Sequence, residues 1–345
     1  MKLTSLDAPG YEKVVYAEDE ASGLKSIIAV HSTKLGPAAG GCRMFAYPDI
    51  EAAKTDALRL ARGMTYKNAA ASLPLGGGKS VIIADPHKDK TPELMQAFGR
   101  FVESFDGMYT TAEDVGISVE DIEEAAKFTS YAAGLTKGEY ASGDPSPVTA
   151  RGVYLSCMAA LKHAFGHDRI EGKTVALQGL GHVGMYLAGH LHEAGASLVV
   201  TDIDAHAVAQ ARQKFSARSV APDDIHDVDA DIFAPCAMGA ILNANTIPRL
   251  KAKLVCGAAN NQLADDAAGE ALLEKGIVYA PDYVVNGGGI INVSAEILKI
   301  TDQKWVDQKV EQLAVTTDKI LTKAKALNAS PHKVADQFVD EILAQ

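Results

Sequence analysis

The chain has 345 residues, 47% of them hydrophobic and 22% charged, which is the composition of an ordinary globular protein. This length exceeds what one hydrophobic core usually supports, so we expect two domains separated by a cleft. The formal net charge of −11 opposes phosphate backbones and anionic lipid heads and argues against nucleic acid or membrane partners. With no apolar leader and no apolar run near ~18 residues, the protein is expected in the cytoplasm.

The cysteines give no sign of a metal site. They are widely scattered, with neither a CxxC spacing nor the paired histidines that structural zinc sites use. We therefore expect free, mostly buried thiols and no bound metal. The four cysteines are Cys42, Cys157, Cys236 and Cys256.

The N-terminal half has the pattern of a separate α/β domain, which we place at residues 1–135. A stretch rich in Gly, Ser and Pro follows at 134–152 and is interpreted as a connector. The predicted strands are 26–33 and 79–86, and the predicted helices are 50–71, 91–105 and 119–129.

In the C-terminal half, short β-branched runs alternate with helical stretches, which implies βαβ units and a doubly wound parallel sheet of the Rossmann type. We place this domain at 136–300, where the glycines of 286–292 end the alternation. Apolar residues at helical spacing predict C-terminal helices within 301–345 that pack back across the domains. The predicted strands are 174–178, 197–202, 231–235, 253–258 and 276–281.

The first of these C-terminal strands runs directly into GLGHVG and then into a helix, the context that a dinucleotide-binding GxGxxG motif needs. Gly179 permits a tight turn, Gly181 lets the backbone approach a pyrophosphate, and Gly184 allows close helix–strand packing. The variable loop residues His182 and Val183 are counted with this cofactor site, although a solvent-facing loop residue is the simpler interpretation of His182.

Asp202 ends the next strand, about 20 residues after the glycine loop, where an acid accepts hydrogen bonds from the adenosine ribose. A carboxylate there disfavours a 2′-phosphate, so the sequence favours NAD over NADP. The alternative is an aspartate that only caps a turn at the strand end. Asp204, two residues on, is interpreted as such a cap.

Two lysines stand out in the segment GMTYKNAAASLPLGGGKSVII, residues 63–83. Lys79 follows three glycines and begins an apolar strand, and this glycine run predicts a backbone that passes very close to another group. A lysine held near a second cation and away from water can act as a base near neutral pH. The alternative for Lys67 or Lys79 is a solvated surface charge. A P-loop is excluded because Leu73 stands where its first glycine would be.

Eight segments between about residues 30 and 295, taken together and in order, resemble the glutamate/leucine/phenylalanine/valine dehydrogenase family. Within it the chain looks closest to leucine dehydrogenases, with phenylalanine dehydrogenases next. The segments are LGPAAGGCRM (35–44), GMTYKNAAASLPLGGGKSVIIADP (63–86), TAEDVG (111–116), GDPSPVTARGVY (143–154), GLGHVG (179–184), DIFAPCAMG (231–239), GAANNQL (257–263) and YAPDYVVNGGGIINV (279–293).

The resemblance implies an enzyme for the reversible, NAD-dependent oxidative deamination of an apolar L-amino acid to its 2-oxo acid and ammonium. Leucine and other branched-chain amino acids are the expected substrates, and phenylalanine is the alternative. The first domain would bind the substrate, carry the catalytic residues and form a homo-oligomer, with dimer and octamer both open. The second domain would bind NAD.

The resemblance also assigns roles to residues of the N-terminal half. Lys67 would pair with the substrate carboxylate, assisted by backbone amides around Gly40 and Gly41. Lys79 would activate the water that attacks an imine carbon, and Asp114 would shuttle protons. Acid–base chemistry is needed twice in this reaction, once for attack of water on the imine and once for collapse of the resulting carbinolamine.

In the C-terminal half, the resemblance implies that Asn260 orients substrate and nicotinamide and that Thr149 holds the carboxamide, while Asn261 is open to a purely structural turn role. The expected side-chain pocket is apolar throughout, so a charged substrate side chain would be left unpaired at a high desolvation cost. The pocket residues are Ala39, Met64, Ala112, Ile290 and Val293.

Two rival functions share the fold and the cofactor. A 2-hydroxy acid dehydrogenase normally uses a histidine base with an arginine that clamps the carboxylate, and His31 and Arg43 are the residues that could serve. A non-catalytic NAD-binding protein would be expected to lack one of Lys67, Lys79 or Asp114, and all three are present.

Overall fold

The structure is a computed structural model that describes all residues 1–345. The chain divides into two compact units, each made of two segments. The first unit is Met1–Asp144 with Asn292–Gln303, and the second is Pro145–Ile291 with Lys304–Gln345. The range expected for the parallel-sheet domain, 136–300, therefore contains residues at both of its ends that belong to the first unit.

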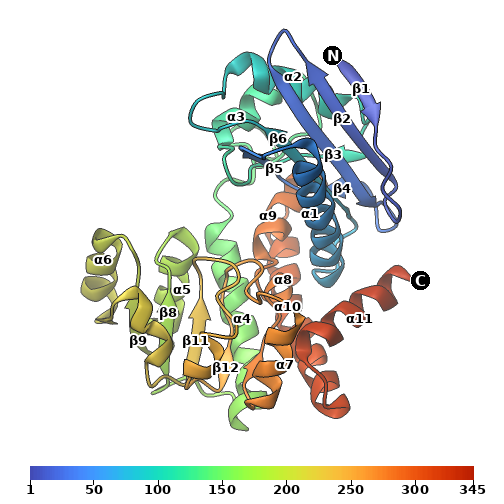
Figure 1. Cartoon of the computed structure of the whole chain (residues 1–345). Helices are drawn as coiled ribbons and strands as arrows, with labels where there is room; N and C mark the ends of the chain where they lie inside the picture. Colours follow the sequence, from blue (N-terminus) through green and yellow to red (C-terminus); the bar gives the residue numbers. More distant parts are fainter. The chain divides into compact units, whose positions relative to one another are not determined.

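The first unit is built on a seven-stranded mixed sheet of order β1-β2-β3-β6-β4-β7, in which β5 also pairs with β6 (Figure 1). The strands β1, β2, β3 and β6 run antiparallel to their neighbours in this series, whereas β4 and β5 run parallel to β6. The strands are β1 (Lys2–Ser5), β2 (Lys13–Asp19), β3 (Leu24–Ser32), β4 (Ala38–Ala39), β5 (Cys42–Phe45), β6 (Gly76–Ile83) and β7 (Tyr109–Thr110).

Helices cover both faces of this sheet because its strands are apolar on both sides. On β2, Val14 and Tyr16 pack in the core that contains α1, whereas Val15 and Ala17 pack in the core that contains α2 and α3. At the N-terminus of each helix, a side chain accepts a hydrogen bond from a free backbone N–H. The capping residues of α1, α2 and α3 are Asp49, Thr91 and Ser118, respectively. The helices are α1 (Ile50–Ala70), α2 (Pro92–Glu103) and α3 (Val119–Ala125).

The second unit contains a six-stranded, fully parallel sheet of order β10-β9-β8-β11-β12-β13. Counted within the unit, this is the order 3-2-1-4-5-6 of the Rossmann fold, with the direction of strand addition reversing between β8 and β11. The strands are β8 (Thr174–Gln178), β9 (Ser197–Thr201), β10 (Arg218–Ser219), β11 (Ile232–Pro235), β12 (Leu254–Val255) and β13 (Val278–Tyr279).

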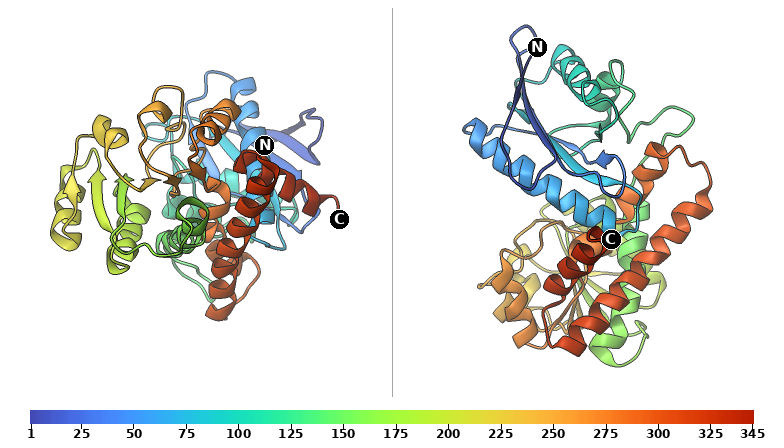
Figure 2. Two further views of the ribbon diagram at one scale, coloured as in Figure 1. Left: turned by 90° about the horizontal axis from the view of Figure 1, so that it is seen from below. Right: turned by 90° about the vertical axis from the view of Figure 1, so that its right-hand side faces the viewer.

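One face of the parallel sheet packs against α4 and α5, and the other against α7 and two short 3-10 helices. The long helix α10 lies beside α4, where His163 bonds Asp318 at 2.7 Å (Figure 2). None of the helices has both the length and the apolar character that a membrane span requires. The helices are α4 (Ser146–Phe165), α5 (His182–Glu193), α6 (Ala205–Phe215), η1 (Pro222–Asp227), η2 (Ile247–Arg249), α7 (Asp266–Glu274), α8 (Asp282–Val285), α9 (Gly288–Ile297), α10 (Gln303–Leu327) and α11 (Pro331–Leu343).

Two glycine-rich segments differ from what the sequence predicts. The expected connector 134–152 includes the first two turns of α4, which begins at Ser146. The expected end of the alternating half, 286–292, contains the start of α9. A Cβ on Gly288 would lie 2.3 Å from the Val148 carbonyl oxygen of α4, so this glycine permits a close contact between two helices.

Candidate active site

The glycines before Lys79 belong to strand β6 itself, which begins at Gly76. A Cβ on Gly77 would lie 2.0 Å from the Thr65 backbone nitrogen of α1, and a Cβ on Gly78 would lie 2.6 Å from the Tyr109 ring. The predicted close passage of the backbone is therefore confirmed. The neighbouring groups are the protein's own helix and a buried tyrosine.

Lys79 is buried, with 5% of its surface exposed, and forms an ion pair with Asp114. Its Nζ donates a hydrogen bond to Asp114 Oδ2 at 2.5 Å. The loop that carries Asp114 is fixed by hydrogen bonds from Cys42 N to Ala112 O at 2.7 Å and from Ile117 N to Asp114 O at 2.9 Å. The group bonded to Lys79 is thus a carboxylate, and the nearby second cation, Arg43, shares that carboxylate with it.

Burial opposes the ionisation of Asp114, but its neighbours outweigh this effect. Lys79, and more weakly Arg43, hold the pKa of the Asp114 carboxyl below its usual value. Asp114 is therefore held as a carboxylate, paired with the Lys79 ammonium. Cys42 does not compete as a nucleophile, because burial raises the pKa of its thiol to about 12.

The sequence interpretation missed Asp114's contact with Arg43, whose Nε donates to Asp114 Oδ2 at 3.3 Å. Another nitrogen of the same guanidinium, Nη1, donates to Asp56 Oδ2 at 3.0 Å. No sequence spacing reveals this contact, because 71 residues separate Arg43 from Asp114 and the contact depends on strand pairing.

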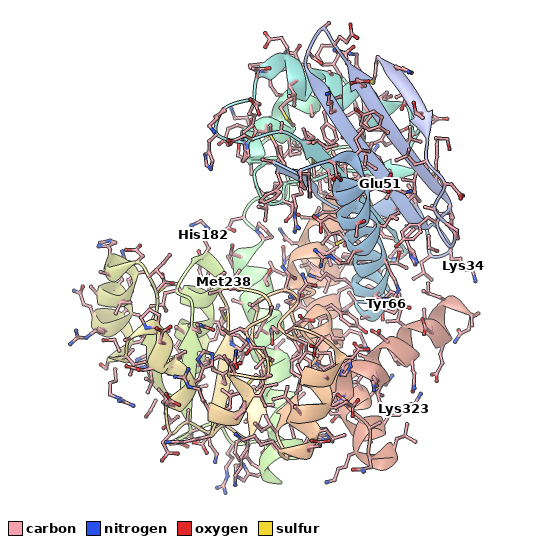
Figure 3. All side chains as sticks on the ribbon, in the orientation of Figure 1. Lys34, Glu51, Tyr66, His182, Met238 and Lys323 are labelled. Atoms are coloured by element: carbon pink, nitrogen blue, oxygen red, sulfur yellow. The ribbon has the colours of Figure 1, made fainter.

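Lys67 lies in the last turn of α1, next to Tyr66, which marks that end of the helix in Figure 3. Met64 precedes Lys67 by three residues, so the two share one side of the helix. A Cβ on Gly40 would lie 3.0 Å from Met64 Cγ, so the segment of Gly40 and Gly41, here called the GG turn, lies beside this part of α1.

One expected role in the GG turn is wrong. The amide of Gly40 donates to the Thr110 carbonyl at 3.2 Å, so it is already paired within the sheet and is not free for a substrate carboxylate. Gly41 lies one residue further on, where a Cβ would meet Glu113 O at 2.4 Å and Asp114 Cβ at 3.0 Å. Among the expected pocket residues of this unit, Ala39 is fully buried, and Met64, Ala112 and Val293 are half-buried.

In the second unit, the glycine motif forms the turn between β8 and α5. Gly179 has a φ of +98°, which favours glycine, and a Cβ on Gly184 would lie 2.0 Å from Gly179 O. Helix α5 has Gly181 at its N-cap and no side-chain cap, so its first N–H groups have no capping side chain. His182 is exposed, and Figure 3 shows it with Met238 at one edge of this unit.

This turn fits a dinucleotide pyrophosphate. A Cβ on Gly181 would meet no protein atom within 4 Å, so the space over the α5 N-terminus is open. The turn lies at the carboxyl end of β8, beside the point where the strand order reverses, which is where α/β sheets of this type bind their ligands. The N–H groups and the helix dipole there favour an anion.

Asp202 takes part in this turn, because its Oδ2 accepts from Leu180 N at 2.5 Å and its Oδ1 accepts from Asp204 N at 2.8 Å. Each carboxylate oxygen keeps a further lone pair, so a ribose hydroxyl could still donate to it. Asp204 caps α6 as expected, with its side chain accepting from His206 N at 2.8 Å. The sequence interpretation missed Ile203, an isoleucine that is 96% exposed beside the acid.

Four further residues from the expected site also belong to the second unit. Asn260 is exposed, and its Oδ1 accepts from Asn286 Nδ2 at 2.9 Å. Thr149 Oγ1 donates a hydrogen bond at 2.9 Å to the carbonyl oxygen of Pro145, the N-cap residue of α4. Ile290 is half-buried in the part of α9 that belongs to this unit. Asn261 has a φ of +52°, which supports a turn role for it.

The fold and these residues define a class of protein, an α/β oxidoreductase in which a mixed-sheet unit accompanies a Rossmann unit. Two family models cover nearly the whole chain. "Glu/Leu/Phe/Val dehydrogenase, dimerisation domain" matches residues 12–131, and "Glutamate/Leucine/Phenylalanine/Valine dehydrogenase" matches 142–209 and 201–337. The chain belongs to this family and is an amino acid dehydrogenase.

Individual relatives support the same assignment. The chain is 52% identical to leucine dehydrogenase of Bacillus subtilis (strain 168), over 96% of this chain and 91% of the relative. It is 46% identical to phenylalanine dehydrogenase of Caldalkalibacillus thermarum (strain TA2.A1), over 96% and 91%. Among solved structures, L-tryptophan dehydrogenase from Nostoc punctiforme matches with a TM-score of 0.86 and 41% identity, over 97% of this chain and 96% of that chain.

Proposed function

We propose that the protein catalyses the reversible, NAD-dependent oxidative deamination of apolar L-amino acids, with leucine and other branched-chain amino acids preferred. The products are the 2-oxo acid and ammonium. The observation that carries this proposal is the ion pair of the buried Lys79 with the half-buried Asp114, 2.5 Å apart, in a chain of the amino acid dehydrogenase family. A hydrogen-bonded base and acid, shielded from bulk water, are what the two proton-transfer stages of the reaction require.

In this proposal, Lys67 binds the substrate carboxylate as a point charge, and the Gly41 region supplies the adjacent backbone. NAD, when bound, would accept the hydride from the substrate Cα and leave an iminium group. Lys79 then removes a proton from the water that attacks the iminium carbon. Asp114 moves protons to and from the nitrogen, so that ammonium can leave as the carbonyl forms.

The second unit would hold the cofactor. The N-terminus of α5 would bind the pyrophosphate above Gly181, and Asp202 would accept a hydrogen bond from the ribose. The exposed Ile203 offers an apolar surface for the adenine ring, and a carboxylate at 202 disfavours the extra phosphate of NADP. Thr149 and Asn260 are proposed to orient the nicotinamide, Asn260 also contacting the substrate.

The side chains proposed to contact the substrate side chain are all apolar, which favours a neutral amino acid over glutamate. Two of the matched relatives are a leucine dehydrogenase, at 52% identity, and a phenylalanine dehydrogenase, at 46% identity. We prefer the branched-chain assignment, and a difference of one methylene changes selectivity by only about 1–3 kcal/mol, so overlap with phenylalanine is expected. The proposed residues are Ala39, Met64, Ala112, Ile290 and Val293.

The contacts of Arg43 and His31 disfavour the 2-hydroxy acid dehydrogenase. Arg43 binds two internal carboxylates, those of Asp114 and Asp56, and is not free to clamp a substrate. Nδ1 of His31 is hydrogen-bonded to Thr65 Oγ1 at 2.8 Å, so this ring nitrogen is already engaged within the protein.

The test follows NADH absorbance with the purified protein, NAD and a panel of L-amino acids at alkaline pH. We expect turnover with leucine, isoleucine and valine, slower turnover with phenylalanine, and none with glutamate or 2-hydroxy acids. A protein that binds NAD but oxidises no apolar amino acid would contradict the proposal. Oxidation of 2-hydroxy acids alone would support the rival enzyme.

We also propose that the protein is a homo-oligomer. The family model that matches residues 12–131 is described as a dimerisation domain, which supports this part of the proposal. Light scattering coupled to size-exclusion chromatography measures the mass directly and separates a dimer from an octamer. A monomer of 36.3 kDa would contradict it.

A further inference from the structure

Arg43 and Lys79 point to the same side of the sheet in the first unit. Arg43 lies on β5 and pairs in register with Val81 of β6, two residues beyond Lys79. Register partners on parallel strands share a face, as do residues two apart on one strand. Val81 packs in the core that contains α1, so Arg43 and Lys79 both belong to the face that α1 covers.

Both cations bind one oxygen of the same carboxylate. Asp114 Oδ2 accepts from Lys79 Nζ at 2.5 Å and from Arg43 Nε at 3.3 Å. The other oxygen, Oδ1, takes part in neither ion pair. The side chains of Arg43 and Asp114 are 21% and 25% exposed, so the contact is largely shielded from water.

Arg43 is itself held from the other side by α1. Its Nη1 donates to Asp56 Oδ2 at 3.0 Å, and the same oxygen accepts from Tyr47 OH at 2.7 Å. Arg59 of α1 donates to the second oxygen of Asp56 at 2.6 Å. The guanidinium therefore bridges two carboxylates, one anchored in α1 and one in the site.

We propose that Arg43 is a positioning residue for the dehydrogenation, one that fixes the Asp114 carboxylate and supplies a constant positive charge while Lys79 loses and regains its proton. This inference rests on the proposed function. When Lys79 passes its proton on, Asp114 would otherwise face a neutral amine in a shielded site. An arginine keeps its proton throughout, so Asp114 stays ionised and ready to accept one.

The first test replaces Arg43 by lysine and by glutamine. R43K keeps the positive charge but loses the forked guanidinium that bridges the two carboxylates, so kcat should fall by about tenfold. R43Q loses both the charge and the bridge, so kcat should fall by about 100-fold. The KM for NAD should stay within about twofold of wild type, since the proposed NAD site lies in the second unit. Arg100→Gln, which removes the guanidinium over the Phe128 ring on the outer side of α2, is the matched control.

The pH profile provides a readout that a purely structural role would not change. Removing the positive charge of Arg43 raises the pKa of Asp114, so the acid limb of kcat/KM should move to higher pH in R43Q and stay in place in the Arg100→Gln control. The charged or titratable groups around Asp114 in this cluster are Lys79, Arg43, Asp56, Tyr47, Glu113 and Cys42.

A double-mutant cycle tests whether Asp56 acts through Arg43. Asp56→Asn should lower kcat by about three- to tenfold, and the double variant R43Q/D56N should be no slower than R43Q, because the same interaction is removed twice. If R43K is too unstable to assay, the double-mutant cycle still tests the inference, because it does not use that variant. R43Q with the wild-type kcat and pH profile would overturn the inference while the proposed function stands, and additive losses would overturn the link from Asp56 through Arg43. A wild-type enzyme that oxidises no amino acid would overturn both.

Discussion

Asp114 is the only acid shared by Lys79 and Arg43 in the site, so its charge supports stability as well as chemistry. In Asp114→Asn, the buried Lys79 loses its counter-charge, and we expect the free energy of unfolding at pH 6 to fall by about 3 kcal/mol. The folded-state pKa of Asp114 is lowered, so its contribution is present above the unfolded-state pKa and is lost as pH falls through the folded value. Urea denaturation should therefore show the gap between wild type and variant narrowing from pH 6 to pH 3. A gap that stays constant would contradict this account of Asp114.

Asp202 tests the proposed choice of cofactor. Wild type should prefer NAD to NADP, and Asp202→Ser should reduce that preference by at least about tenfold, because one charge-assisted hydrogen bond to the ribose is lost. The matched control is Asp204→Ser, which removes the carboxylate two residues away while serine can still cap α6. The measurement is kcat/KM for both cofactors. If the ratio of kcat/KM for NAD to kcat/KM for NADP is unchanged in Asp202→Ser, Asp202 only stabilises the turn and does not bind the ribose.

At the residue scale, the sequence predicts the candidate catalytic side chains better than it predicts the residues that those side chains contact. The glycine run singled out Lys79 because each glycine needed a close neighbour, and the structure confirms those neighbours at Gly77 and Gly78. Arg43 and Asp56 could not be found in the same way, because their contacts depend on β5 lying between β6 and the Asp114 loop. The paired amide of Gly40 depends on β4 and β7 lying side by side, which no local motif shows.

The contact between β6 and α1 is the element-scale feature that places Lys79. In Gly77→Ala, the new methyl group would meet the Thr65 backbone at 2.0 Å, and backbone cannot move aside as a side chain can. We expect the free energy of unfolding to fall by at least about 1–3 kcal/mol. Gly63→Ala in the same α1 meets no atom within 4 Å and should instead stabilise the protein by about 0.5–1 kcal/mol. Equal effects of the two substitutions in urea denaturation would contradict this account.

Elements with strong local patterns were predicted from sequence, and those set by packing were not. The predicted strand 174–178 is β8, and 231–235 differs from β11 by one residue, because both are β-branched runs bounded by turn residues. Strand β2 was not predicted, since its short apolar run has no period that distinguishes a strand from a helix. The start of α4 was missed because Gly152 resembles a connector residue, whereas it permits close packing: a Cβ at this position would lie 2.9 Å from Leu313 Cδ1 and 3.3 Å from Val285 O.

At the scale of the whole molecule, the chain passes between the two units three times, after Asp144, Ile291 and Gln303. The sequence pattern indicates two domains and an alternation of strands and helices that forms a doubly wound parallel sheet. It could not show that residues 292–303 return to the first unit, because helix α9 continues across that boundary without a break in its pattern.

Glu296 ties this returning segment to the rest of the first unit. Its carboxylate accepts from Gly134 N at 2.9 Å, from Leu135 N at 3.2 Å, and from Ser142 N and Oγ at 3.1 and 2.7 Å. Glu296→Gln places an amide donor against these donors, so we expect a loss of about 1–3 kcal/mol and faster proteolysis within 134–142. Glu311→Gln, at a glutamate side chain that is 63% exposed, should change neither measurement. Unchanged proteolysis in Glu296→Gln would contradict this account.

Product stoichiometry tests the central proposal most directly. Wild-type protein is incubated with NAD and L-leucine, and NADH, ammonium and the 2-oxo acid are measured in the same sample, with Lys79→Ala in parallel. We predict equal amounts of all three products from wild type, and none from Lys79→Ala, which should still bind NAD with nearly unchanged affinity. NADH formed without ammonium, or Lys79→Ala turning over at the wild-type rate, would contradict the account.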